Sequence, residues 1–178
     1  MILPRLIIGR LIKLTMKNVE VRKSQIQGTG VYSLKNYKVG EVILDIDDSQ
    51  VIADPSTLSQ EDNEYNCDYL DNGRIILMKE PERCINHSCD PSTYVKTIDG
   101  VRKVIAKKNI KVGDEITYDY AINGENAGTF TCRCGSNKCR GVYIGNFFKL
   151  PVALQKEYLP YLDSWFANKY KEELEKLA

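Results

Sequence analysis

The chain has 178 residues, of which 43% are hydrophobic and 28% are charged, so it is long enough and apolar enough for one globular domain. Its formal net charge is only +1, which argues against a protein that binds nucleic acid through bulk positive charge. No glycine-rich motif of the Rossmann or phosphate-loop type is present, which excludes the common nucleotide-binding loops.

The first segment, residues 1–17, is basic and apolar. It contains Arg5, Arg10, Lys13 and Lys17 and no acid. A proline, a glycine and the two arginines interrupt its apolar run, which is therefore too short for a signal-peptide core or a membrane span. We expect a short strand or an irregular extension here. Since no other stretch approaches membrane length, we expect a soluble, intracellular protein without membrane contact.

Short strands are predicted over the following hundred residues, because Val, Ile and Tyr recur there between glycine turns. The predicted strands are 19–24, 30–34, 41–47, 74–79, 92–98, 101–108 and 115–120. Asp99-Gly100 is a strong signal for a hairpin between two of them. The pattern N-x-K-V-G-acid-x-Ile occurs twice, at 36–43 and at 109–116. We interpret the two copies as similar glycine turns within one domain, not as a repeat protein.

The pattern changes to helical spacing after Leu150. The apolar residues with this spacing are Leu162, Trp165, Phe166, Tyr170, Leu174 and Leu177. Pro151 is compatible with the first turn of a helix, and Pro160 is expected to separate two helices. We expect this tail to pack on the domain and not to carry function.

The chain contains six cysteines, and three of them form a C-x-C-x4-C cluster: Cys132, Cys134 and Cys139. Thiols two residues apart in an extended chain are poor disulfide partners, but they can share a metal ion. A structural zinc ion takes four thiolate or imidazole ligands, so one more ligand is needed. The candidates are the remaining cysteines and the only histidine: Cys67, Cys84, Cys89 and His87. Disulfides are the alternative, disfavoured in a reducing cell.

Four motifs in a fixed order resemble one known family. They are QGTGVYS, RCINHSCDPS, GDEITYDY and CRCGSNKCRG. Together they resemble the SET domain family of protein-lysine methyltransferases, including its cysteine-rich post-SET segment, over roughly residues 18–145. The resemblance implies a mainly β (α+β), β-clip-like fold of small curved sheets. In this fold the NHSC and YDY segments pass each other in a knot-like crossing.

The same resemblance implies how the chain is divided. Residues 1–17 would be an N-terminal extension and 18–131 the SET domain. Residues 132–148 would be a zinc-bound post-SET knuckle, and 149–178 a C-terminal helical tail.

The resemblance also implies two cofactors, S-adenosyl-L-methionine and zinc. The residues implied in binding the methyl donor are Gly28, Thr29, Gly30, Arg83, Asn86 and His87. The implied zinc ligands are Cys89, Cys132, Cys134 and Cys139. The rival metal site consists of the three clustered cysteines and His87.

Two tyrosines carry the implied catalysis. Tyr120 matches the family's catalytic tyrosine, whose hydroxyl orients the amine, although by spacing alone it would be a core aromatic of a strand. Tyr118 occupies a position where the family carries Tyr or Phe. Glu115 matches a family acid at the crossing, and both it and Asp119 can also be interpreted as plain acids at a strand edge. Aromatic residues expected to close over the adenine or the lysine channel are Tyr143, Phe147 or Phe148.

The implied function is S-adenosylmethionine-dependent N-methylation of an exposed lysine in a histone or another basic protein, with a preference for adding one methyl group. We expect no direct binding of nucleic acid. The location would be the nucleus or cytoplasm of a eukaryote, or the cytoplasm of a prokaryote. Two alternatives stay open: a catalytically silent SET scaffold that binds a peptide, and a methyltransferase of a small amine.

Overall fold

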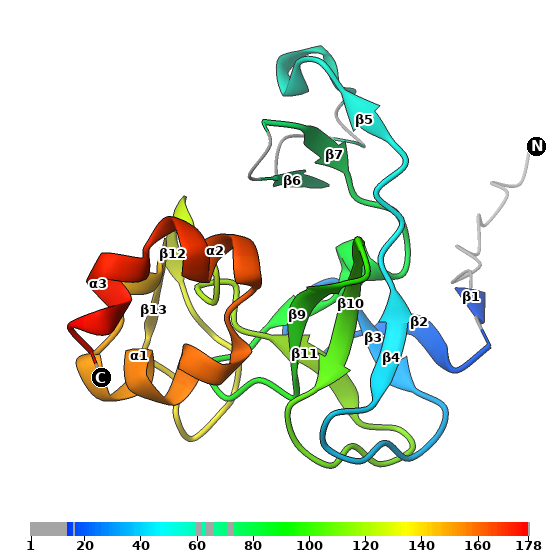
Figure 1. Cartoon of the computed structure of the whole chain (residues 1–178). Coiled ribbons are helices and arrows are strands. Elements are labelled where there is room, and N and C mark those ends of the chain that lie inside the picture. Colours follow the sequence, from blue (N-terminus) through cyan, green and yellow to red (C-terminus); the bar gives the residue numbers. More distant parts are fainter. Residues whose placement is uncertain (1–13, 16, 60–61, 63–65, 71–72, 178) are drawn as a thin grey trace, which may run out of the picture.

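The computed structural model describes residues 14–15, 17–59, 62, 66–70 and 73–177. Within this part, short strands form three small sheets, and short helices gather at the C-terminal end (Figure 1). Most of the segment expected to form an N-terminal extension lies outside the described residues. None of the described helices has the length and hydropathy needed to cross a membrane.

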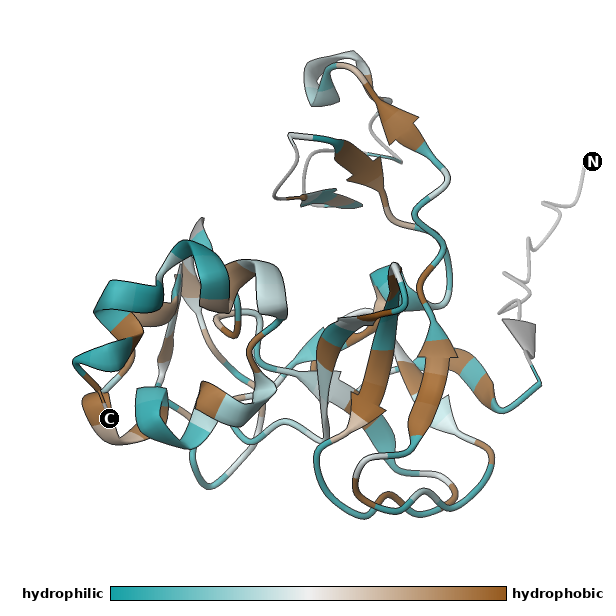
Figure 2. Ribbon diagram, viewed as in Figure 1, coloured by the Kyte–Doolittle hydropathy of each residue, from teal (hydrophilic) through white to brown (hydrophobic). Residues whose placement is uncertain are grey.

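The largest sheet has the order β1-β2-β3-β11-β9-β10-β4, and β8 pairs with β11 beside this path. Its strands are β1 (Leu14–Thr15), β2 (Val19–Lys23), β3 (Thr29–Ser33), β4 (Val42–Asp45), β8 (Asn86–His87), β9 (Thr93–Ile98), β10 (Val101–Ala106) and β11 (Glu115–Tyr118). The predicted hairpin is confirmed: Asp99 and Gly100 have φ angles of 51° and 76°, as a type I′ turn between β9 and β10 requires. Figure 2 shows hydrophobic residues along β4 and β10.

The chain from β8 to β9 passes around the end of β11. Strand β8 runs parallel to β11, with Asn86 opposite Thr117 and His87 opposite Tyr118. Strand β9 then begins beside the same position, with Thr93 opposite Tyr118. The NHSC and YDY segments therefore lie against each other at the centre of the sheet, where their crossing was predicted.

The two N-x-K-V-G segments pair with each other. Tyr37 and Ile110 exchange backbone hydrogen bonds of 2.8 and 2.9 Å. The Asn36 side chain, from the first copy, accepts a hydrogen bond from the Val112 N–H of the second copy at 3.0 Å. The repeated pattern thus forms a local pair of turns within one domain, as interpreted from the sequence.

A separate three-stranded sheet projects from the rest of the described chain (Figure 1). In its order, the strands are β5 (Val51–Ile52), β7 (Ile75–Leu77) and β6 (Cys67–Tyr69). Arg102 of β10 joins this sheet to the main one, because its guanidinium binds Asp48 at 2.6 and 2.8 Å and also binds Asp68 of β6. The sequence predicted the strand at 74–79 but not that it belongs to a sheet of its own.

The C-terminal third contains a hairpin and the helical tail. The hairpin consists of β12 (Glu125–Thr131) and β13 (Val142–Asn146), neither of which was predicted. The tail contains η4 (Phe147–Lys149), α1 (Val152–Tyr158), η5 (Leu159–Tyr161), α2 (Ser164–Lys169) and α3 (Lys171–Glu175). Pro160 lies in η5 and separates α1 from α2, as expected. Phe147, Tyr158 and Phe166 pack in one hydrophobic core, so the tail is docked on the domain. The cysteines buried in the same core are Cys89, Cys132 and Cys134.

Candidate active site

Tyr120 stands just beyond the end of β11, beside the crossing. Its hydroxyl donates a hydrogen bond of 2.7 Å to the carbonyl of Ile85, and its backbone N–H donates to Nδ1 of His87 at 3.4 Å. The Tyr118 and Tyr143 rings lie 4.6 and 5.9 Å from its ring centroid. Burial raises the pKa of Tyr120 above that of a free tyrosine. The phenol is therefore protonated at neutral pH and held in one orientation.

Glu115 and Asn86 tie the Gly-Thr-Gly segment to this crossing. The Glu115 carboxylate accepts hydrogen bonds from Ser24 (2.8 Å), from Tyr32 (3.0 Å) and from the Asn86 amide (2.9 Å). The same amide donates to the carbonyl of Thr29 at 3.0 Å. Asn86 thus packs at the crossing through its side chain, and the half-buried Glu115 carboxylate binds three side chains and is not a plain edge acid.

Gly30 is required for a reason that the sequence did not show. A Cβ atom at Gly30 would lie 2.2 Å from Oε1 of Glu115. Gly28 has a φ of +48°, in the left-handed region that favours glycine. The Gly-Thr-Gly segment therefore brings its backbone against the crossing, where a methyl donor was predicted to bind.

His87 lies between Tyr120 and the cysteine cluster. It is buried, and burial lowers its pKa to about 4 against the opposing effect of Asp119, so the imidazole is neutral at pH 7. Because Nδ1 accepts the N–H of Tyr120, the proton sits on Nε2, which lies 3.4 Å from Sγ of Cys89. His87 thus donates to one of the clustered thiols while its ring contacts Tyr120.

Four cysteines converge as predicted. The sulfur atoms of Cys89, Cys132, Cys134 and Cys139 all lie within 4.8 Å of one another. The Cys89 and Cys132 sulfurs are 3.7 Å apart, far longer than a disulfide. Four thiolates around one tetrahedral zinc ion would be roughly 3.8 Å apart, given a bond length of about 2.3 Å. The four residues therefore fit a zinc ion.

Backbone N–H groups around the four cysteines donate hydrogen bonds that stabilise a negative charge on sulfur. The Arg140 N–H donates to Sγ of Cys89 at 3.4 Å, and the Cys89 N–H donates to Sγ of Cys134 at 3.5 Å. Burial raises the pKa of Cys134, but the N–H groups of Cys89 and Ser136 and the neighbouring thiols outweigh it and lower the pKa to about 7. Burial raises the pKa of the Cys89 and Cys132 thiols, so of these three cysteines only Cys134 is shifted toward thiolate, the form that binds a metal ion. Cys67 and Cys84 lie outside the cluster.

Two aromatic residues of the hairpin complete the site. Phe130 stacks on Tyr143 with ring centroids 4.5 Å apart, and both rings meet His87 edge-on. Phe130 is 43% exposed although it lies beside these buried rings, so a ligand could still cover it. The Tyr143 hydroxyl is buried, and no hydrogen-bond partner for it exists among the described residues. The predicted alternatives, Phe147 and Phe148, pack instead against Phe166 in the tail.

Arg83 is the predicted site residue that the structure does not bring to Tyr120. Its guanidinium forms ion pairs with Asp62 (3.0 Å) and Glu80 (3.2 Å) at the surface. Its role in binding the methyl donor stays a prediction.

Asp119 is the site residue that sequence reasoning missed. The interpretation as a strand-edge acid was wrong, because Asp119 is fully buried and pairs with both terminal nitrogens of Arg140 at 2.6 and 3.0 Å. The hydroxyl of Tyr158 donates to the same carboxylate at 3.1 Å. The sequence did contain one signal, Arg140, which directly follows Cys139. Its guanidinium is a cation that can compensate a buried acid.

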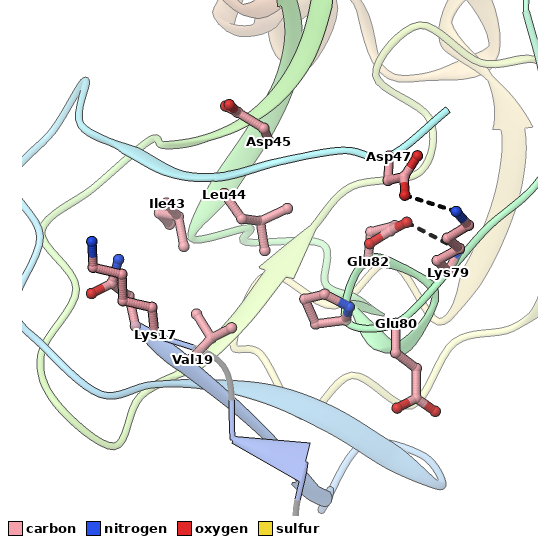
Figure 3. A pocket seen from close by; sticks show the side chains of 11 residues that line it. Lys17, Val19, Ile43, Leu44, Asp45, Asp47, Lys79, Glu80 and Glu82 are labelled. Atoms are coloured by element: carbon pink, nitrogen blue, oxygen red, sulfur yellow. Dashed lines mark hydrogen bonds and ion pairs between the residues drawn. The ribbon is translucent and has the colours of Figure 1, made fainter. Parts of the chain in front are cut away.

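A cavity of about 340 Å³ lies elsewhere, beside β4 (Figure 3). Its lining includes apolar Val19, Ile43, Leu44 and Pro81, and charged Lys17, Asp45, Asp47, Lys79, Glu80 and Glu82. Figure 3 shows Lys79, whose ammonium pairs with Asp47 at 2.8 Å and whose backbone N–H donates to Glu82 at 3.0 Å. The residues that contact Tyr120, namely Ile85, His87, Tyr118 and Tyr143, do not line this cavity. The cavity is therefore a separate feature of the fold.

Comparison with known proteins agrees with the geometry. The sequence model described as "SET domain" matches residues 28–121, which is more than half of the chain. Human histone-lysine N-methyltransferase SETD1B is 32% identical over 143 residues, covering 73% of this chain and 7% of that protein. A Cryptococcus neoformans protein named "Histone-lysine N-methyltransferase, H3 lysine-4 specific" is 30% identical over 151 residues, covering 73% and 10%.

Among solved structures, a Plasmodium falciparum crystal structure described as a candidate histone methyltransferase has a TM-score of 0.47 and 26% identity, covering 60% of this chain and 95% of that one. The match to the two curated relatives spans only a tenth or less of their length. Because the SET domain model matches residues 28–121, this chain belongs to the SET domain family.

Proposed function

We propose that this chain is an S-adenosylmethionine-dependent protein-lysine N-methyltransferase whose substrate is a lysine in the tail of histone H3. The observation that carries the proposal is the Tyr120 phenol, protonated and anchored on Ile85 at the crossing of a SET domain. The names of two relatives support a histone, and one of them names lysine 4 of H3. A histone substrate would place the protein in a nucleus.

The site offers what this reaction needs. Methyl transfer breaks a carbon–sulfur bond and forms a carbon–nitrogen bond in line, so the reacting atoms must be aligned and the lysine must be uncharged. Tyr118, Tyr120 and Tyr143 form an aromatic neighbourhood in which burial lowers the pKa of an amine. The fixed Tyr120 oxygen would orient the amine nitrogen, while the lysine proton leaves to solvent before transfer.

The residues present fit the methyl donor. Tyr143 has a buried hydroxyl without a partner in the described structure, and Phe130 is a half-covered ring beside it. Both features suit a polar ligand with an aromatic base. We propose that Gly28, Thr29, Gly30, Asn86 and His87 hold the donor, which when bound supplies a methyl group on a sulfonium.

The first test is a methyl-transfer assay with labelled donor and a peptide of the H3 N-terminus. We expect label on the peptide, and none when its fourth residue is changed from lysine to arginine. Binding of the peptide without any label would favour a silent SET scaffold. Label on small amines and none on the peptide would favour a small-amine methyltransferase, and either result would contradict the proposal.

We further propose that transfer stops mainly after one methyl group, because Tyr118 narrows the space beside Tyr120. A methylated amine must rotate to present its lone pair, and displacing a water held by the Tyr118 hydroxyl would cost about 2 kcal/mol. Such a cost slows the second transfer about thirtyfold. Tyr118→Phe is therefore expected to raise the share of dimethyl product, as measured by mass spectrometry at saturation.

The unmodified sequence is the control for that variant. Abundant trimethyl-lysine from it, or an identical product ratio in both proteins, would show that Tyr118 only packs in the core.

A further inference from the structure

A residue of the C-terminal tail forms a hydrogen bond with Asp119, the residue before Tyr120. Tyr158, on α1, is 1% exposed, and its hydroxyl donates to Oδ2 of Asp119 at 3.1 Å. Asp119 is 0% exposed and directly precedes Tyr120. The residues that match the SET family model end at 121, so this contact joins the family's core to a segment outside it.

Asp119 shapes the turn on which Tyr120 stands. Its Oδ1 accepts the N–H of Ala121 at 3.1 Å, and its carbonyl accepts the N–H of Ile122 at 2.9 Å. These two bonds fix the backbone just after Tyr120, while His87 fixes the Tyr120 N–H. The orientation of the Asp119 carboxylate therefore helps to set the direction of the Tyr120 side chain.

Besides the Ala121 N–H, two side chains donate to the Asp119 carboxylate. The Arg140 guanidinium contacts both carboxylate oxygens, and Arg140 itself directly follows the cluster residue Cys139. The Tyr158 hydroxyl donates to Oδ2 from helix α1 of the tail. Without Tyr158, Oδ2 is held only by Arg140, which directly follows Cys139, while Oδ1 keeps the Ala121 N–H, so the Oδ2 side of the carboxylate gains freedom to move with the cysteine cluster.

We propose that Tyr158 is a positioning residue for Tyr120, acting through Asp119, and that the tail is thereby part of the active unit. This inference rests on the proposed methyltransferase function. It differs from the expectation that the tail only packs on the domain. Because the Tyr158 side chain is buried and its hydroxyl is bonded to Asp119, removal of that hydroxyl should change the rate of transfer and not the binding of either substrate.

The test is Tyr158→Phe, which removes the hydroxyl and leaves the ring in the core. Misplacement of a catalytic group by a fraction of an ångström is enough to slow a reaction, and we expect kcat to fall about tenfold. The KM values for donor and peptide should stay within about twofold. Steady-state kinetics with both substrates varied measures this split.

Two matched controls separate positioning from stability. Tyr161→Phe makes the same change in the same tail, at a ring that packs on Tyr94 with centroids 4.9 Å apart. Gln155→Leu removes a buried polar group of α1 whose amide donates to the carbonyls of Leu150 (2.7 Å) and Phe148 (3.3 Å). We expect the second control to lower the melting temperature, and both controls to keep kcat.

The outcomes are distinct. An unmodified protein without transferase activity would overturn the proposed function itself. An active protein in which Tyr158→Phe has the same kcat as Tyr161→Phe would overturn the positioning role. Equal loss of kcat in Tyr158→Phe and Gln155→Leu would assign the effect to tail stability, which would also overturn it.

Discussion

Tyr120→Phe is expected to lower kcat for methyl transfer by about 100- to 1000-fold, the usual effect of removing one preorganised hydrogen-bonding group from a reacting centre. The hydroxyl is held by the Ile85 carbonyl at 2.7 Å, and the ring is packed against Tyr118 and His87. Phenylalanine keeps this packing, so donor affinity should stay within about twofold. Single-turnover rates and calorimetric titration of the donor measure the two quantities separately.

Tyr37→Phe is the matched control. Tyr37 is 2% exposed in the other hydrophobic core, and its hydroxyl has no hydrogen-bond partner in the described part of the chain. Its loss should change neither rate nor affinity. A Tyr120→Phe variant that transfers methyl groups at the unmodified rate would remove Tyr120 from catalysis, and one that loses donor binding would show that the hydroxyl serves binding instead.

The parts of this fold that follow local patterns were predictable from the sequence. Alternating β-branched residues located the main strands, and Asp99-Gly100 located a hairpin because both positions need left-handed backbone. The ligand preferences of zinc left four candidates for the fourth ligand, which are Cys67, Cys84, Cys89 and His87. The resemblance to the SET domain family then selected Cys89, which the convergence of the four sulfurs supports.

The parts that depend on distant pairings were not predictable. The interpretation of Asp119 as a plain strand-edge acid was wrong because its partners Arg140 and Tyr158 are 21 and 39 residues away in the sequence. Glu115 likewise binds Ser24 across 91 residues. The β12–β13 hairpin was missed because its strands contain glycines and polar residues, and because a ten-residue connection with three cysteines, residues 132–141, separates them.

Removal of the metal is expected to have the largest effect on stability. We propose one zinc ion held by the four thiolates, which joins the NHSC segment to the segment that continues into β13. A structural zinc site contributes several kcal/mol of folding free energy, so chelation should lower the melting temperature by on the order of 10 °C or more. It should also abolish donor binding, because Phe130 and Tyr143 flank the cluster in sequence. Metal analysis, thermal melts and donor titration measure these three effects.

Cys89→Ser tests the same site at one ligand and also tests its rival. The Cys89 sulfur accepts hydrogen bonds from Arg140 and, by the tautomer argued above, from His87, so its loss disturbs the knuckle and the Tyr120 neighbourhood together. We expect metal loss in this variant and full retention in the control Cys84→Ser, whose thiol is outside the cluster. Two reactive thiols should be counted with zinc bound and six after its removal.

Purified reduced protein without stoichiometric zinc would refute the metal site. Full zinc retention in Cys89→Ser together with loss in His87→Ala would instead make the imidazole the fourth ligand.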